Sequence, residues 1–174
     1  MTLEFRRATL ADVASLHELV ESAYRGEASR AGWTTEADFL DGQRTDADEL
    51  SALVHGRATR LLLAHQGGEL VGCVMLREEP LCAYLGMLST RPNLQSAGIG
   101  RALLDEAERV AREDLGKAEM RMRVISMRDS LIAWYERRGY ARSGEREPFP
   151  YDEPRAGTPK RADLDFVVMR KALG

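Results

Sequence analysis

The sequence is poor in cysteine, with Cys73 and Cys82 as its only two. Each lies in an apolar segment typical of a strand, so we expect buried free thiols in a reducing compartment. This expectation excludes a fold that depends on disulfides. Cysteine and histidine also show no metal-type spacing, which predicts a protein without a bound metal.

Long apolar runs and a strong charge bias are missing too. No stretch approaches the roughly 18 apolar residues of a membrane span, and residues 1–7 have no apolar core of signal-peptide type. We therefore expect a cytoplasmic protein with no membrane partner. The formal net charge is only −3, and lysine and arginine are scattered among acids, which argues against a nucleic-acid partner. A length of 174 residues fits a single domain, 1–174.

Strand and helix patterns alternate along the chain. Strand patterns cover residues 3–6, 59–65, 69–77, 82–90, 118–126, 140–146 and 164–171. Helical patterns start at Thr9, resume at Thr34 and again at Asp46, and then cover residues 99–115 and 129–139. The alternation predicts the α/β class, and a hairpin around residues 66–68 makes the sheet mixed.

The most informative segment joins the apolar strand to the longest helix. Its loop reads Gln95-Ser96-Ala97-Gly98-Ile99-Gly100. A helix start presents unpaired N–H groups and the positive end of the helix dipole, and glycines let an anion come close to them. The Gln95 amide could add a hydrogen bond to the same anion. The segment predicts a phosphate-binding turn, with a tight strand-to-helix turn as the simpler alternative.

Together with a second motif, this loop resembles the GNAT superfamily of acyl-CoA-dependent N-acyltransferases. The loop is similar to the family's Gln/Arg-x-x-Gly-x-Gly/Ala pyrophosphate motif. Residues 131–140, Leu-Ile-Ala-Trp-Tyr-Glu-Arg-Arg-Gly-Tyr, are similar to the family's second signature, and a helix and a strand separate the two, as in the family. The resemblance implies a single-domain GNAT-like fold, with helices on both faces of a mixed sheet that splays between its fourth and fifth strands.

The resemblance also implies how acetyl-CoA binds. Backbone groups of Leu88, Ser89 and Thr90 would hold the pantetheine arm, and backbone amides of the loop would hold the pyrophosphate. The loop residues implied are Gln95, Ser96, Ala97, Gly98, Ile99, Gly100 and Arg101. Arg91 or Arg101 could reach the remaining phosphate. Many members have a cofactor-binding asparagine where this chain has Arg128, so that contact is in question, with Asp129 or Ser130 as a substitute.

Tyr135 matches the general acid of the family. An amine that attacks a thioester expels a thiolate, and a phenol with a pKa of about 10 is close enough to a thiol of about 8.5 to supply the proton. The alternative is that Tyr135 is simply a core aromatic. Some members carry a catalytic glutamate where this chain has Tyr84, so another acid would have to deprotonate the amine through water. Glu27, Asp38, Glu78 and Glu79 are candidates, and each could equally be a surface acid.

The resemblance places the acceptor against residues 24–43 and 149–162. These segments combine bulky aromatics with acids in polar, turn-rich sequence. They predict a pocket with aromatic walls and negative charge, suited to a small amine or an amino-acid-like molecule. The residues named for it are Glu27, Trp33, Asp38, Tyr84 and Tyr151. Alternatively, the aromatics attach long loops to the core.

The function implied is transfer of an acetyl group from acetyl-CoA to a primary amine, by direct attack in a ternary complex. The partners are then acetyl-CoA and the amine, with a homodimer as a further expectation. The alternative is a catalytically silent CoA-binding domain that acts as a sensor or binds a partner protein.

Overall fold

A mixed seven-stranded sheet forms the centre of the computed structural model, which describes residues 2–174. The strands in sheet order are β1 (Leu3–Arg7), β3 (Thr59–Gln66), β4 (Glu69–Glu78), β5 (Ala83–Thr90), β6 (Glu119–Ile125), β9 (Asp165–Ala172) and β7 (Ala141–Pro148). Neighbours are antiparallel except β5 and β6, which run parallel. A separate pair joins β2 (Leu40–Asp41) to β8 (Thr158–Pro159). The predicted α/β class with a mixed sheet is confirmed.

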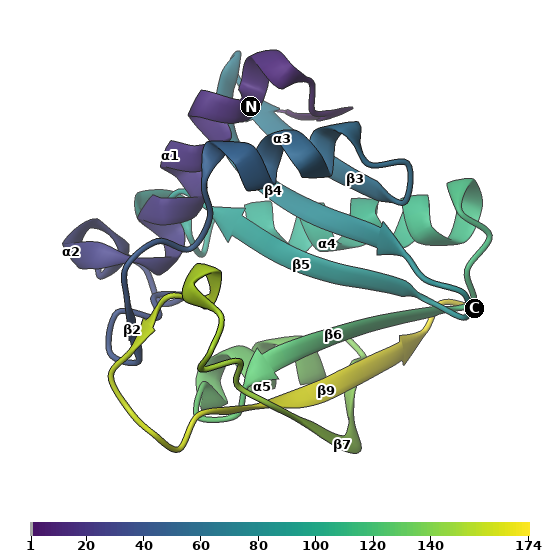
Figure 1. Cartoon of the computed structure of the whole chain (residues 1–174). Helices are drawn as coiled ribbons and strands as arrows, with labels where there is room; N and C mark the ends of the chain where they lie inside the picture. Colours follow the sequence, from purple (N-terminus) through teal and green to yellow (C-terminus); the bar gives the residue numbers. More distant parts are fainter. Residues whose placement is uncertain (1) are drawn as a thin grey trace.

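Helices cover both faces of this sheet (Figure 1). On one face α1 (Val13–Tyr24) and α3 (Ala47–His55) pack over β3, β4 and β5. On the other lie α4 (Ile99–Arg109), continued by a π-helical turn (Val110–Asp114), and α5 (Asp129–Glu136). The remaining helical pieces are α2 (Gly26–Ser29) and the 3₁₀ turns Leu10–Asp12, Pro92–Leu94 and Pro154–Ala156.

The helix predicted to begin at Thr34 is wrong. Residues 34–36 are not helical, and the helical turn of this region, α2, lies before them. The backbone N–H groups of Trp33 and Thr34 donate to the side-chain oxygen of Gln95, at 2.8 and 3.3 Å. The Glu36 N–H likewise donates to the Tyr24 carbonyl at 2.8 Å, so partners distant in sequence hold this segment in a non-helical conformation.

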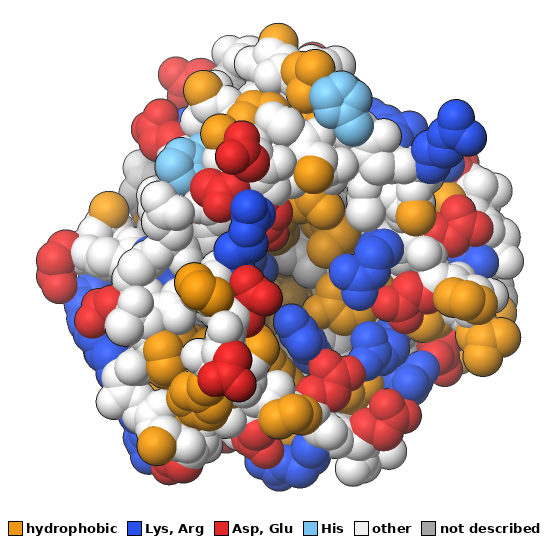
Figure 2. Space-filling view, in the orientation of Figure 1, with side chains coloured by type: hydrophobic (Ala, Val, Ile, Leu, Met, Phe, Trp, Pro, Cys, Tyr) orange, Lys and Arg blue, Asp and Glu red, His pale blue; other side chains and the backbone are white. Residues whose placement is uncertain are grey.

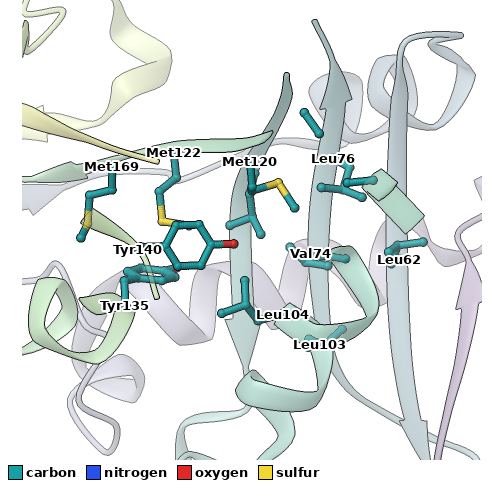
Figure 3. Packing of buried hydrophobic residues seen from close by; sticks show 14 of the residues in the cluster. Leu62, Val74, Leu76, Leu103, Leu104, Met120, Met122, Tyr135, Tyr140 and Met169 are labelled. Carbon is teal, nitrogen blue, oxygen red and sulfur yellow. The ribbon is translucent and has the colours of Figure 1, made fainter. Parts of the chain in front are cut away.

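Two clusters of buried hydrophobic residues, one on each face of the sheet, pack the helices against it. Leu103 and Leu104 of α4 pack under the sheet with a row of methionines that includes Met120, and Figure 3 shows this cluster from close by. On the opposite face Leu16 and Leu50 belong to a second buried cluster, which also contains Cys73. Cys73 and Cys82 are both free and buried, as predicted. Within residues 2–174, no helix is long and apolar enough to cross a membrane.

The sheet opens between β5 and β6, which is the predicted splay. These strands pair only at Ala83 with Met120 and at Tyr84 with Arg121, and then they diverge (Figure 1). The pairing of β4 with β5 also shifts register after Gly86, and Met87 there has a left-handed φ of 53°. A bulge of this kind bends a strand and increases its twist. The gap leaves the β6-facing edge of β5 without a strand partner beyond Tyr84.

Candidate active site

Two cavities meet at the opening between β5 and β6. The first, about 550 Å³, lies between the glycine loop and α5, and we call it the loop cavity. The loop cavity is lined by Tyr24, Trp33, Thr34, Leu88, Thr90, Gln95, Ser96, Gly98, Gly100, Arg101, Ser130, Leu131, Trp134, Tyr135, Arg137 and Arg138. The two sequence motifs, far apart in the chain, therefore face one space.

The start of α4 provides the backbone groups of the loop cavity. Gly98 caps the helix with a φ of 84°, in the left-handed region. A Cβ there would meet nothing within 4 Å, so the backbone conformation, not crowding, requires glycine. The first N–H groups of a helix have no intrahelical partner, and they suit an anion. Of the other predicted loop residues, Ala97 and Ile99 do not line the cavity, and Ile99 is buried in the core.

The predicted pantetheine-binding residues of β5 divide into two kinds. Leu88 and Thr90 line the loop cavity. Ser89 is buried, its register partner is Cys73 of β4, and its hydroxyl donates to the Met87 carbonyl at 3.0 Å. Alternation along the strand accounts for this difference, because successive residues face opposite sides.

The Gln95 side chain is engaged within the protein and is not directed at an anion. Besides accepting from Trp33 and Thr34, its amide donates to the Thr34 hydroxyl at 2.6 Å. A Cβ on Gly32 would lie 2.3 Å from the Gln95 Oε1, so only glycine permits this approach. Gln95 therefore fastens residues 32–34 to the glycine loop.

Three arginines give the loop cavity a positive wall: Arg101, Arg137 and Arg138. Arg138 lies over the Trp134 ring, 3.7 Å from its centroid. Burial, together with the charges of Arg137 and Arg101, lowers the pKa of Arg138. Like charges gathered around one space favour a bound anion. Arg91, the other predicted phosphate ligand, does not line the cavity, since its Nε donates to the Leu70 carbonyl at 2.8 Å.

The second cavity, about 480 Å³, lies on the other side of the opening, and we call it the arginine cavity. Figure 2 shows the face of the molecule hollowed here, with basic and acidic side chains beside the hollow. Its charged lining residues are Arg25, Arg44, Arg123, Arg128 and Arg155, against Glu36, Glu49 and Glu153. The predicted negative pocket is therefore wrong in sign, because arginines outnumber acids.

Glu36 holds two of these arginines. Its carboxylate is buried and lies 2.5 Å from Arg25 Nη1 and 3.2 Å from Arg128 Nη1. Burial opposes ionisation, but the charges of Arg128, Arg25 and Arg44 outweigh it, so the pKa of Glu36 is lowered. Arg128 also donates to the Thr34 carbonyl. Arg128 therefore lines the arginine cavity and not the loop cavity. Of the two expected substitutes, Asp129 and Ser130, only Ser130 lines the loop cavity.

Four residues line both cavities: Tyr24, Leu88, Leu131 and Tyr135. The Tyr24 hydroxyl donates to the Leu88 carbonyl. The Tyr135 ring packs edge-on against Trp134 and Tyr140, with centroids 5.1 and 5.7 Å away, and Figure 3 shows it beside Tyr140. Burial, and to a smaller extent the neighbouring Tyr24, raises the pKa of Tyr135. Tyr135 is thus both a core aromatic and a residue at the junction.

The five residues predicted for the acceptor do not gather in one place. Tyr84 lines the arginine cavity, and Trp33 lines the loop cavity instead. Glu27 and Asp38 are exposed, and both pair with Arg30, at 3.2 and 2.9 Å. Tyr151 lines neither cavity. Its hydroxyl accepts from the Leu164 N–H at 2.8 Å, and its ring packs against Phe149, with centroids 5.0 Å apart.

The predicted proton acceptors also lie outside the cavities. Glu78 pairs with Lys117 at 3.3 Å and Glu79 with Arg77 at 3.0 Å, while Glu27 and Asp38 pair with Arg30 as described. Sequence reasoning missed Glu49, which lines the arginine cavity and whose Oε2 accepts from the Thr45 hydroxyl at 3.1 Å. No group of three or more His, Cys, Asp or Glu side chains in the described chain is arranged to hold a metal ion.

Solved structures of several acetyltransferases share this architecture. The Escherichia coli ribosomal-protein-S18-alanine N-acetyltransferase is 16% identical, with a TM-score of 0.73 over 99% of this chain and 95% of that one. YncA of Salmonella typhimurium, solved with acetyl-CoA, is 21% identical, with a TM-score of 0.72 over 100% and 95%. The PaiA N-acetyltransferase of Thermoplasma acidophilum, solved with coenzyme A, is 20% identical, with a TM-score of 0.71 over 99% of both chains.

Comparison with curated protein sequences gave no match. The family model described as the acetyltransferase (GNAT) family matches residues 14–140, which contain both motifs and every residue common to the two cavities. Acetyl-CoA is the co-substrate of this family, and the cradle at the start of α4 with its three arginines fits the phosphates of that molecule. The chain belongs to the acetyltransferase (GNAT) family.

Proposed function

We propose that the protein transfers an acetyl group from acetyl-CoA to a primary amine of a small or amino-acid-like molecule, by direct attack in a ternary complex. One observation carries this proposal: Tyr24, Leu88, Leu131 and Tyr135 line both cavities. A donor held in the loop cavity and an acceptor held in the arginine cavity would meet at these four residues. Direct transfer needs such a meeting point and needs no nucleophile on the protein.

The donor side is supported by charge and by backbone. Arg101, Arg137 and Arg138 and the start of α4 offer donors to phosphates. The β6-facing edge of β5 has no strand partner beyond Tyr84, so its backbone groups near Leu88 and Thr90 can bond an amide-containing arm. This is how a sheet edge accepts an extended peptide.

The chemistry follows from the residues at the junction. The amine nitrogen forms a bond to the thioester carbonyl carbon, the carbon–sulfur bond breaks, and the departing thiolate needs a proton. Burial raises the pKa of Tyr135, so its phenol stays protonated until the thiolate forms. The same burial disfavours the free thiolate at the junction, which therefore takes the proton. The cysteines take no part, since neither lines a cavity and burial raises the pKa of Cys73 to about 12.

The amine must lose a proton before or during attack. Glu49 supports this step best, because it is half-buried in the lining of the arginine cavity and no arginine in the described chain pairs with it, whereas Glu153, the other lining acid without an arginine, is exposed. Glu36 is a poor proton acceptor, since its pKa is lowered and Arg25 and Arg128 occupy its oxygens. We assign Glu49 as the group that takes this proton, through water.

The proposal is tested by incubating the protein with acetyl-CoA and a panel of primary amines. Free thiol is followed in solution, and the acetylated amine is identified by mass spectrometry. We expect thiol release that depends on the amine and matches product one to one. Tight binding of CoA with no turnover on any amine would contradict the enzyme and favour the catalytically silent sensor.

A further inference from the structure

We infer that the acceptor carries a carboxylate besides its amine, and that Arg44 binds this carboxylate. The inference rests on the proposed function, because it concerns the acceptor of the same cavity. It names the substrate class as amines with one negative charge, such as amino acids, and it disfavours polyamines.

Four of the five arginines in the arginine cavity already have an anionic partner. Arg25 and Arg128 share the Glu36 carboxylate. The other two pair at the cavity wall, where Arg123 lies 3.2 Å from Glu147 and Arg155 lies 3.6 Å from Asp46. Arg44 is the exception: within residues 2–174 no carboxylate oxygen lies within 4.0 Å of its guanidinium nitrogens.

Arg44 is nevertheless held in place. Glu21 Oε1 accepts the backbone N–H groups of Arg44 and Thr45, at 2.6 and 2.9 Å, which fixes the chain at this point. The guanidinium lies over the Tyr24 ring, with its central carbon 5.5 Å from the centroid, and the residue is half-buried. Tyr24 lines both cavities, so the Arg44 guanidinium packs on a ring that belongs to the junction.

The charge around Arg44 favours an anion of low charge. Glu36 leaves one net positive charge when it pairs with Arg25 and Arg128, and Arg44 adds another. Glu49 and Glu153 are the lining acids that no arginine within residues 2–174 pairs with, so the cavity offers separate cationic and anionic groups, which suit a zwitterion. A polyamine would place one of its ammonium groups against Arg44. A guanidinium binds a carboxylate through two parallel hydrogen bonds, and a half-buried site strengthens them. One unpaired arginine matches one carboxylate, while Glu49 in the same cavity suits the ammonium group of an amino acid.

The inference is tested with pairs of amines that differ only in the anionic group. L-Amino acids with apolar side chains are compared with their carboxamides, and spermidine serves as the cationic amine. We expect kcat/KM for the carboxylate to exceed that for the carboxamide by about tenfold or more. At the assay pH a larger fraction of the carboxamide has its amine in the neutral, reactive form. This difference favours the carboxamide and therefore acts against the expected result. A preference for carboxamides or for spermidine would overturn the inference.

Variants assign the preference to Arg44. In Arg44→Gln the carboxylate-to-carboxamide ratio should fall to near one through a higher KM for the carboxylate, and Arg44→Lys should keep an intermediate ratio. Arg57→Gln is the matched control, because Arg57 is exposed, lies outside both cavities and loses the same charge. An unchanged ratio in Arg44→Gln would overturn the assignment. If Arg44→Gln proves unstable, Arg44→Lys decides alone by its lower ratio.

Binding measured without acetyl-CoA separates this inference from the proposed function. Calorimetry compares N-acetyl-L-leucine with N-acetyl-L-leucinamide on wild type and on Arg44→Gln. If no amine is acetylated but the carboxylate binds in an Arg44-dependent way, the proposed enzyme fails and the anion site stands. If amines are acetylated but neither ligand shows Arg44 dependence, the enzyme stands and the inference is overturned.

Discussion

At the scale of the residue, Glu36 decides the stability of the arginine cavity. Replacing it by glutamine leaves two buried guanidinium groups without a carboxylate. Breaking a buried ion pair by removing one partner costs roughly 3–5 kcal/mol, so we expect Glu36→Gln to lower the free energy of unfolding by about that amount at pH 7. Urea unfolding measures it. Glu27→Gln, at an exposed pair with Arg30, is the control and should change little.

The pH dependence of the same variant has a definite sign. Because the pKa of Glu36 is lowered in the folded state, its stabilisation is fully present above the unfolded value of 4.5 and is lost as pH falls through the folded value. The difference between wild type and Glu36→Gln should therefore shrink below pH 4.5. A difference that stays constant down to pH 3 would contradict the ion-pair account of Glu36.

Replacing the Glu49 carboxylate should slow the reaction. Glu49→Gln should lower kcat about a hundredfold, the usual loss when a general base is removed, and amines that are already neutral at the assay pH should suffer least. Initial rates across pH measure it. Glu78→Gln is the control, because it makes the same substitution at a residue outside both cavities, and it should retain the wild-type rate. Equal losses in both variants would refute the assignment.

At the scale of the element, the start of α4 separates folding from binding. Gly98→Ala forces a left-handed φ on a residue with a Cβ, so we expect a loss of about 1 kcal/mol in stability. Gly100→Ala lies inside the helix, and its Cβ would meet Trp134 at an ordinary 3.7 Å, so stability should hold or rise. Both should raise the KM for acetyl-CoA, because both crowd the phosphate site. A normal KM in both variants would contradict a phosphate site here.

Sequence reasoning succeeded where the information is local. Helix Ile99–Arg109, the glycine loop before it and the aromatic motif in α5 are each written in one continuous stretch. It failed where side chains far apart in sequence meet. The Arg128–Glu36 pair leaves no periodic trace, and nothing local indicates that Gln95 fastens residues 32–34. For the same reason the charge of the arginine cavity could not be predicted, since its residues come from many segments.

At the scale of the whole molecule, few hydrogen bonds join the two halves of the sheet, and bound acetyl-CoA should add contacts between them. Only two residue pairs join β5 to β6, although these strands connect the two halves of the sheet. Acetyl-CoA should therefore slow amide hydrogen exchange at residues 88–90 and 98–102, and leave β1 unchanged. Mass spectrometry of peptides after exchange measures this. Slowing that spreads equally over β1 would indicate general stabilisation and not a site at the splay.

The most direct test of the account compares thiol release from acetyl-CoA by wild type and by Tyr135→Phe, with a free amine that the wild-type protein acetylates as the acceptor. In residues 2–174 the Tyr135 hydroxyl has no hydrogen-bond partner, so its removal should leave stability nearly unchanged. We predict a fall in kcat of about a hundredfold or more, with little change in the KM for acetyl-CoA. A kcat equal to that of wild type would contradict Tyr135 as the proton donor at the junction of the two cavities.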